Sequence, residues 1–146
     1  MPLVLLADDN PSDVYLIREA LREHTVECSL KVASDGREAL NLIFDTAPES
    51  GIEDFSLIIL DLNLPRHDGI EILQKLRDTS KLNPVPVVVL TSSDSPRDRL
   101  MATQLGAARY LRKPSNLNEF LDLGAVFKEL LAQPSKAARA SGASHD

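Results

Sequence analysis

Acidic, hydroxyl and basic side chains follow the apolar runs of this 146-residue sequence, at the point where each run ends. They are Asp8 with Asp9, Asp61, Thr91 with Ser92, and Lys113 with Pro114. If the runs are parallel strands of one sheet, their carboxyl ends share one edge, where ligands bind in folds of this kind. Residues spread over more than a hundred positions are then expected to meet in one site.

Three carboxylates in one pocket repel each other strongly, and one would take up a proton unless a cation intervened. Mg²⁺ fits such a pocket because it prefers oxygen ligands and needs few carboxylates. A carboxylate beside Mg²⁺ and a lysine can attack a phosphoryl group to give an acyl phosphate. The metal, the lysine and a hydroxyl would then stabilise the oxygens of the transferring group. The predicted chemistry is phosphoryl transfer to an aspartate.

Each of these residues has a plainer interpretation when it is taken alone. Aspartates that follow strands often cap helices, Thr91 could merely turn the chain, and Lys113 could be a solvated loop cation. Asp61 is the hardest to explain in this way, because a carboxylate that closes so apolar a strand needs a partner. The conjunction of these residue types at the ends of different strands favours a shared site.

The elements that must position these residues alternate along the chain. Five apolar runs predict strands at 3–7, 29–33, 57–60, 85–90 and 109–111. Three of them are almost continuously hydrophobic, as is typical of strands buried on both faces of a parallel sheet. Helix start signals follow the runs, at Asn10, Asp35, Asp68, Ser95 and Asn116. The order predicts an α/β fold with a doubly wound parallel sheet and right-handed crossovers.

Composition limits the function classes. The chain has 22 acidic and 16 basic residues and a net charge of −6, so we expect no nucleic-acid or membrane partner. The single cysteine, Cys28, excludes an internal disulfide and favours a reducing compartment. The sequence contains neither a targeting signal nor an apolar stretch long enough to span a membrane. We therefore expect a cytoplasmic protein with one domain over 1–133 and a flexible tail over 134–146.

The segments LLADDN, LIILDLNLPRHDG, VVVLTSS and YLRKP resemble those of response-regulator receiver domains of bacterial two-component signalling. The resemblance runs from about Leu3 to Leu131. It implies the flavodoxin-like (βα)5 fold of CheY-like proteins, with a five-stranded parallel sheet of order 2-1-3-4-5 flanked by five helices. It also implies a function: a switch controlled by phosphorylation, which accepts a phosphoryl group from a sensor histidine kinase and acts through protein contacts, without being an enzyme for external substrates.

The resemblance also implies roles for single residues. Asp61 would be the phosphoacceptor. Mg²⁺ or Mn²⁺ would be held by carboxylates and a backbone carbonyl, namely by Asp8, Asp9, Asp61 and the carbonyl of Asn63. Lys113 would pair with Asp61 or with the phosphoryl group, and the Lys113–Pro114 bond would be cis. Thr91 would be the switch hydroxyl and Tyr110 the switch aromatic, with a half-buried edge residue that never switches as the alternative for Tyr110.

Three further stretches, NPSDVYLIREAL, TAPESGIED and RKPSNLNEF, resemble the single-domain regulators that work with phytochrome-type histidine kinases. This resemblance implies a bacteriophytochrome as phosphodonor and a homodimer. In the last predicted helix, Leu123, Val126 and Leu130 form a second apolar stripe, which widens the apolar arc beyond one sheet contact. The stripe would either form a dimer interface or pack on the neighbouring first helix.

Other functions make different demands on the same residues. A phosphatase of the haloacid-dehalogenase type has a second aspartate two residues after its nucleophile as general acid/base, and Asn63 stands there. A nucleotide or flavin binder would have a phosphate cradle after the first strand, where this chain has two aspartates. A pseudo-receiver that acts without phosphorylation remains an alternative, although all the chemical positions are filled.

Overall fold

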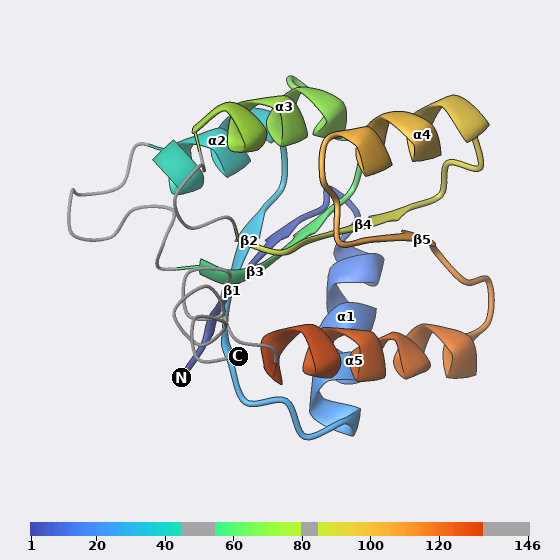
Figure 1. Cartoon of the computed structure of the whole chain (residues 1–146). Coiled ribbons are helices and arrows are strands. Elements are labelled where there is room, and N and C mark those ends of the chain that lie inside the picture. The colour runs from blue at the N-terminus through green and yellow to red at the C-terminus, as the bar shows by residue number, and fades with distance from the viewer. Residues whose placement is uncertain (45–54, 80–84, 133–146) are drawn as a thin grey trace, which may run out of the picture.

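Strands and helices alternate along the computed structural model, which describes residues 1–44, 55–79 and 85–132 (Figure 1). In chain order the elements are β1 (Leu3–Ala7), α1 (Pro11–Glu23), β2 (Ser29–Ala33), α2 (Gly36–Phe44), β3 (Phe55–Leu60), α3 (Gly69–Thr79), β4 (Val87–Thr91), α4 (Pro96–Gln104), β5 (Arg109–Arg112) and α5 (Leu117–Ala132). The predicted tail at 134–146 lies outside the described residues. No described helix is long and apolar enough to cross a membrane.

The five strands form one parallel sheet of order β2-β1-β3-β4-β5, which confirms the predicted topology. The register matters for function. Ala7 at the end of β1 is paired with Leu60 at the end of β3, so the next residues, Asp8 and Asp61, leave the sheet side by side. The Asp61 amide donates to the carbonyl of Ala7 at 2.9 Å and fixes this alignment.

Three strands differ at their boundaries from the sequence prediction, and the smallest difference is in β5, which ends at Arg112, one residue later than expected. β4 begins at Val87, two residues later than expected, and it includes Thr91 as its last residue. Pro86 has no N–H to donate to a sheet, although its carbonyl accepts a bond from Ile58 at 3.0 Å. β3 begins at Phe55, two residues earlier than expected.

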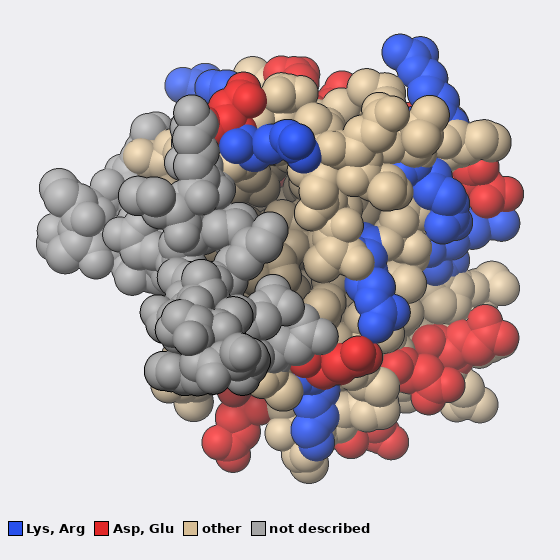
Figure 2. Space-filling model, viewed as in Figure 1, with Lys and Arg blue, Asp and Glu red and all other residues tan. Residues whose placement is uncertain are grey.

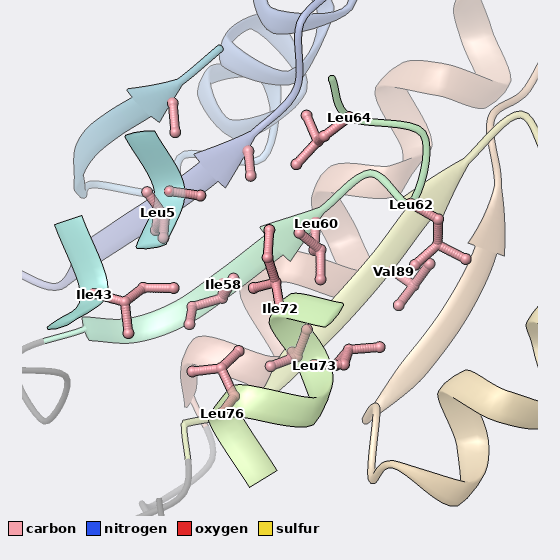
Figure 3. Packing of buried hydrophobic residues seen from close by; sticks show 14 of the residues in the cluster. Leu5, Ile43, Ile58, Leu60, Leu62, Leu64, Ile72, Leu73, Leu76 and Val89 are labelled. Atoms are coloured by element: carbon pink, nitrogen blue, oxygen red, sulfur yellow. The ribbon is translucent and has the colours of Figure 1, made fainter. Parts of the chain in front are cut away.

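Helices cover both faces of the sheet, with α1 and α5 on one face and α2, α3 and α4 on the other (Figure 1). Alternate residues of the central strands point to opposite faces, as the pleat of a strand requires. Leu5, Ile58 and Leu60 therefore pack toward α2 and α3 (Figure 3), whereas Val4 and Ile59 belong to the core beneath α1 and α5. In the part of the chain that the structure describes, the buried polar side chains lie at the strand ends and not within these two cores.

The apolar stripe of α5 packs within the chain. Leu123 and Leu130 are buried in the core that α5 shares with α1, and Val126 is half-buried against it. A Cβ atom at Gly124 would lie 2.2 Å from the carbonyl oxygen of Ala20, so the glycine allows the two helices to touch. Leu123 and Leu130 therefore agree with packing on the first helix, whereas a dimer interface that includes the half-buried Val126 stays a prediction.

Candidate functional site

The buried polar side chains of the described ranges are Asp8, Asp61 and Thr91, and all three lie at the carboxyl edge of the sheet. Asp8 and Asp61 directly follow β1 and β3, Thr91 is the last residue of β4, and their exposed fractions are 2%, 5% and 0%. A buried carboxylate is costly unless it is paired, so two of them on adjacent strands require a cation. The structure thus brings together the strand-end residues that the sequence singled out.

The two buried carboxylates are held by the same local arrangement. Asp8 Oδ1 accepts the backbone N–H of Asn10 at 2.9 Å, and Asp61 Oδ1 accepts that of Asn63 at 3.0 Å. An aspartate side chain often bonds the backbone two residues on, because this closes a tight turn. In each residue this bond fixes Oδ1, and the other oxygen, Oδ2, faces the pocket and can bind a ligand there.

Lys113 supplies the cation. Its Nζ lies 2.8 Å from Asp61 Oδ2, 3.0 Å from Asp8 Oδ2 and 2.7 Å from Asp13 Oδ2. The three N–H donors of the ammonium are therefore all used. Burial alone would lower the pKa of Lys113, but its hydrogen bonds to Asp13, Asp61 and Asp8 outweigh burial and raise that pKa above its usual value. The lysine remains charged and pairs with Asp61, as predicted.

Asp8, Asp9 and Asp61 form a group that fits a divalent cation. One carboxylate oxygen from each lies within 4.8 Å of the others, and Asp9 is exposed to solvent. Burial raises the pKa of Asp8, although its bonds to Asn10 and Lys113 act in the opposite direction. A hard cation relieves this cost, and carboxylate oxygens are the ligands that Mg²⁺ and Mn²⁺ take. The donor set thus agrees with the predicted metal.

The hydroxyl of Thr91 is linked to the same pocket by Asn63, which bonds to both Thr91 and Asp61. Thr91 Oγ1 accepts the backbone N–H of Ser93 at 3.3 Å and the side-chain amide of Asn63 at 3.4 Å. The backbone N–H of Lys113 donates to the Thr91 carbonyl at 2.8 Å, which ties the lysine to the end of β4. The backbones of the two predicted residues are therefore joined at the carboxyl edge of the sheet. The role of the Asn63 carbonyl as a metal ligand stays a prediction.

Tyr110 lies on the edge strand β5 and is half-buried. Its hydroxyl donates to the carbonyl of Ser93 at 3.3 Å, and the guanidinium of Arg99 lies 4.7 Å from the centre of its ring. The aromatic ring thus bridges the β4–α4 loop and α4, next to the residue that bonds Thr91. This position agrees with both interpretations of Tyr110, as switch and as edge aromatic.

The loops around the site contain a glycine that close packing requires and a proline that follows a trans peptide bond. A Cβ atom at Gly69 would lie 2.7 Å from the Cα of Leu62 and 2.8 Å from the carbonyl oxygen of Asp61, so only glycine lets α3 begin this close to the acid. The bond between Lys113 and Pro114 is trans, because the described residues contain no cis peptide. The expected cis bond is therefore wrong here, and the lysine reaches Asp61 without it.

Asp13 is the residue of the site that the sequence did not reveal. It is the third residue of α1, where an acid ordinarily interacts favourably with the helix N-terminus, so its position alone does not indicate a role in the site. In the structure it is also a partner of Lys113, a hundred residues away. Its only sequence signal is its place in the helix that follows the acid pair directly.

Known proteins resemble this chain in sequence. The chain is 32% identical over 121 residues to the response regulator Rcp1 of a Synechocystis species. The aligned region covers 83% of this chain and 82% of that protein. It is 37% identical over 124 residues to the response regulator MprA of Mycolicibacterium vanbaalenii, of which it spans about half, 48%.

Solved structures agree with the sequence comparison. The phosphorylated cyanobacterial phytochrome response regulator RcpA superposes with a TM-score of 0.81 at 30% identity, over 92% of this chain and 98% of that one. The Mn²⁺-bound form of Rcp1 superposes with a TM-score of 0.78 at 31% identity, over 88% and 93%. The family described as the response regulator receiver domain matches residues 4–123, and the chain belongs to this family of two-component phosphorelay proteins.

Proposed function

We propose that Asp61 accepts a phosphoryl group and that Mg²⁺ or Mn²⁺, held by Asp8, Asp9, Asp61 and the carbonyl of Asn63, is required for the transfer. The observation that carries the proposal is the ion pair of Lys113 with a buried Asp61 beside Asp8, at 2.8 Å. One oxygen of Asp61 faces the lysine and the pocket, where an anionic group can be bound. The exposed Asp9 leaves the pocket accessible from solvent.

In the proposed reaction an Asp61 carboxylate oxygen attacks phosphorus. A new P–O bond forms as the P–N bond to the imidazole of a kinase histidine breaks, and the imidazole keeps the electron pair and takes up a proton. The metal, when bound, neutralises charge on the phosphoryl oxygens. Lys113 donates to one of these oxygens, and the Thr91 hydroxyl turns from Asn63 toward another.

Thr91 and Tyr110 connect the site to the surface in this proposal. Thr91 Oγ1 and Tyr110 Oη both bond to the backbone of Ser93, through its N–H and its carbonyl. A movement of Thr91 toward the phosphoryl group therefore loosens the loop that holds the tyrosine. Phosphorylation shifts the population between two arrangements of α4 and β5, and the output is an altered protein contact.

A phytochrome-type histidine kinase is the phosphodonor that we propose. The support is the likeness to RcpA, a phytochrome response regulator, and to Rcp1, over most of the length of each. We further propose that the chain acts in the cytoplasm, turns over no external substrate and does not bind nucleic acid. A homodimer stays a prediction, and its surface must differ from the buried Leu123 and Leu130.

Incubation with acetyl phosphate and Mg²⁺, followed by intact-mass spectrometry, tests the site assignment. The expected result is the gain of one phosphoryl group, which is lost on metal chelation and in Asp61→Asn. Asp122→Asn, which removes an exposed carboxylate of α5, is the matched control and is expected to behave as wild type. A chain that binds its partners but never gains the group would be a pseudo-receiver, and steady release of phosphate from a phosphate ester would indicate a phosphatase.

The proposed donor is tested by transfer from purified, autophosphorylated kinases. A phytochrome-type kinase is expected to pass its phosphoryl group to this chain within seconds to minutes, with a yield that depends on red or far-red illumination. A kinase with an unrelated sensor is expected to transfer slowly. Equal rates from both kinases would contradict the pairing.

A further inference from the structure

We propose that Asp13 is a positioning residue for phosphoryl transfer: its carboxylate holds the Lys113 ammonium in place while the other two partners of the lysine change. The inference rests on the proposed role of Asp61. It concerns a contact between the first turn of α1 and the residue that follows β5, elements a hundred residues apart.

The geometry of this contact is that of a strong ion pair. Asp13 Oδ2 lies 2.7 Å from Lys113 Nζ, the shortest of the three distances that the ammonium makes. The side chains are 17% and 9% exposed, so water competes little for either. The helix cap fixes the carboxylate, because the side chain of Asn10 accepts the backbone N–H of Asp13 at 3.3 Å.

Asp13 differs from the other two partners of the lysine in what it can do. Among the described residues, the carboxylates grouped closely enough to share a metal ion are those of Asp8, Asp9 and Asp61. Asp8 and Asp61 are therefore the partners whose oxygens a metal or a phosphoryl group engages, and their bonds to Lys113 must rearrange. Asp13 is outside this group and is free to keep its bond.

This constancy matters because a lysine side chain is long and flexible. An ammonium has three N–H donors, and two of them must turn to new acceptors when the phosphoryl group arrives. One unchanged partner keeps Nζ within reach while they turn, so that little positional freedom is lost in the transition state. Without Asp13, the Lys113 ammonium would bind whichever of the other two carboxylates was not bound to the metal or the phosphoryl group. We therefore expect Asp13 to increase the rate of transfer through Lys113.

The first test uses the metal-free protein and needs no activity. The ¹⁵N NMR signal of the Lys113 ammonium is expected to be sharp and slowly exchanging in wild type, because all three N–H groups are bonded. In Asp13→Asn it should broaden and exchange faster. Glu23→Gln, at the exposed end of the same helix, is the matched control and should leave the signal unchanged. An unchanged signal in Asp13→Asn would overturn the proposal.

The second test measures phosphorylation by acetyl phosphate at saturating Mg²⁺. Asp13→Asn is expected to lower the maximal rate by about tenfold, with Asp13→Glu recovering part of it. In a Lys113→Met background the same substitution should have no further effect, because Asp13 acts through the lysine. An equal loss in both backgrounds would assign Asp13 a structural role in α1 and overturn the proposal.

The two tests separate this inference from the proposed function. If wild type gains no phosphoryl group, the role of Asp61 fails, and the NMR signal still decides whether Asp13 holds the lysine. If Asp13→Asn does not fold, Asp13→Glu keeps the charge and moves it by one methylene. Wild-type rate and signal in Asp13→Glu would then contradict a requirement for this geometry.

Discussion

The central strands and the edge strand β5 contribute to the site in different ways. Every residue of β4 is buried, as are all residues of β3 but one, whereas no residue of β5 is fully buried. The central strands end in Asp8, Asp61 and Thr91, which are nearly inaccessible to solvent. β5 carries the half-buried Tyr110 and leads to Lys113. The packed centre thus supplies the two buried aspartates and the hydroxyl of the site, and the edge strand supplies the tyrosine and leads to the lysine.

The ends of β5 make exposed ion pairs with neighbouring elements. Basic side chains lie over α4 and β5 in Figure 2, and acidic side chains lie over α5 below them. Arg109 pairs with Glu129 at 3.3 Å, and Arg112 pairs with Asp94 at 3.4 Å, all four being well exposed. Surface pairs of this kind contribute little to stability. A strand held in this way can shift at small cost, which suits a switch.

Lys113 joins the two regions, and its removal should be among the substitutions that lower stability most. Lys113→Met leaves the buried Asp8 and Asp61 without a cation, which costs about 3 kcal/mol of unfolding free energy in metal-free buffer. Mg²⁺ is expected to restore part of this loss. Urea unfolding with chelator and with Mg²⁺ measures both values. Lys128→Met, on the exposed side of α5, is the control, and an equal effect of the two substitutions would contradict the account.

A pair of truncations compares the strands directly. Ile59→Ala in β3 removes a fully buried side chain and should cost about 3 kcal/mol of unfolding free energy. Leu111→Ala in β5 removes a half-buried one and should cost less than half as much. Chemical denaturation of both variants gives the ratio. Equal losses would mean that the edge strand is as tightly packed as the centre.

Metal binding should stabilise the packed side of the site. At a Mg²⁺ concentration a hundred times the Kd, binding to the native state adds about 2.7 kcal/mol. Asp9→Asn is expected to lose most of this gain while its stability in chelator stays at the wild-type value, because Asp9 is exposed. Thermal unfolding with and without Mg²⁺ measures it. A full Mg²⁺ effect in Asp9→Asn would remove Asp9 from the ligand set.

The smallest effect is expected at the tyrosine. Tyr110→Phe removes the bond to the Ser93 carbonyl and should cost about 0.5 kcal/mol, since the hydroxyl is partly exposed. Phosphorylation of Asp61 should continue, but the chemical-shift changes that it causes in α4 should shrink. NMR spectra of the phosphorylated variant test this. Unchanged shifts would favour the interpretation of Tyr110 as an edge aromatic that does not switch.

Sequence reasoning could predict the fold and most of the site for one physical reason. Apolar runs of strand length define a parallel sheet, and a parallel sheet brings the residues after each run to one edge. Asp8, Asp61 and Lys113 followed from this rule without knowledge of any contact. Thr91 is the last residue of its strand rather than the first beyond it, which leaves it at the same edge.

The remainder depended on tertiary contacts that no local pattern contains. Whether Leu123 and Leu130 face a second copy or the first helix depends on how closely α1 and α5 approach, and Gly124 allows this contact. The pairing of Asp13 with Lys113 depends on the direction in which α1 leaves the sheet.

The central claim is that Asp61 carries the phosphoryl group, and chemical trapping tests it most directly. Borohydride reduces an aspartyl phosphate to homoserine, so treatment after incubation with acetyl phosphate and Mg²⁺ marks the modified residue. Peptide mass spectrometry is expected to find homoserine at position 61 and nowhere else, and none when the metal is chelated. Homoserine at another aspartate, or its appearance elsewhere in Asp61→Asn at the wild-type yield, would contradict the claim.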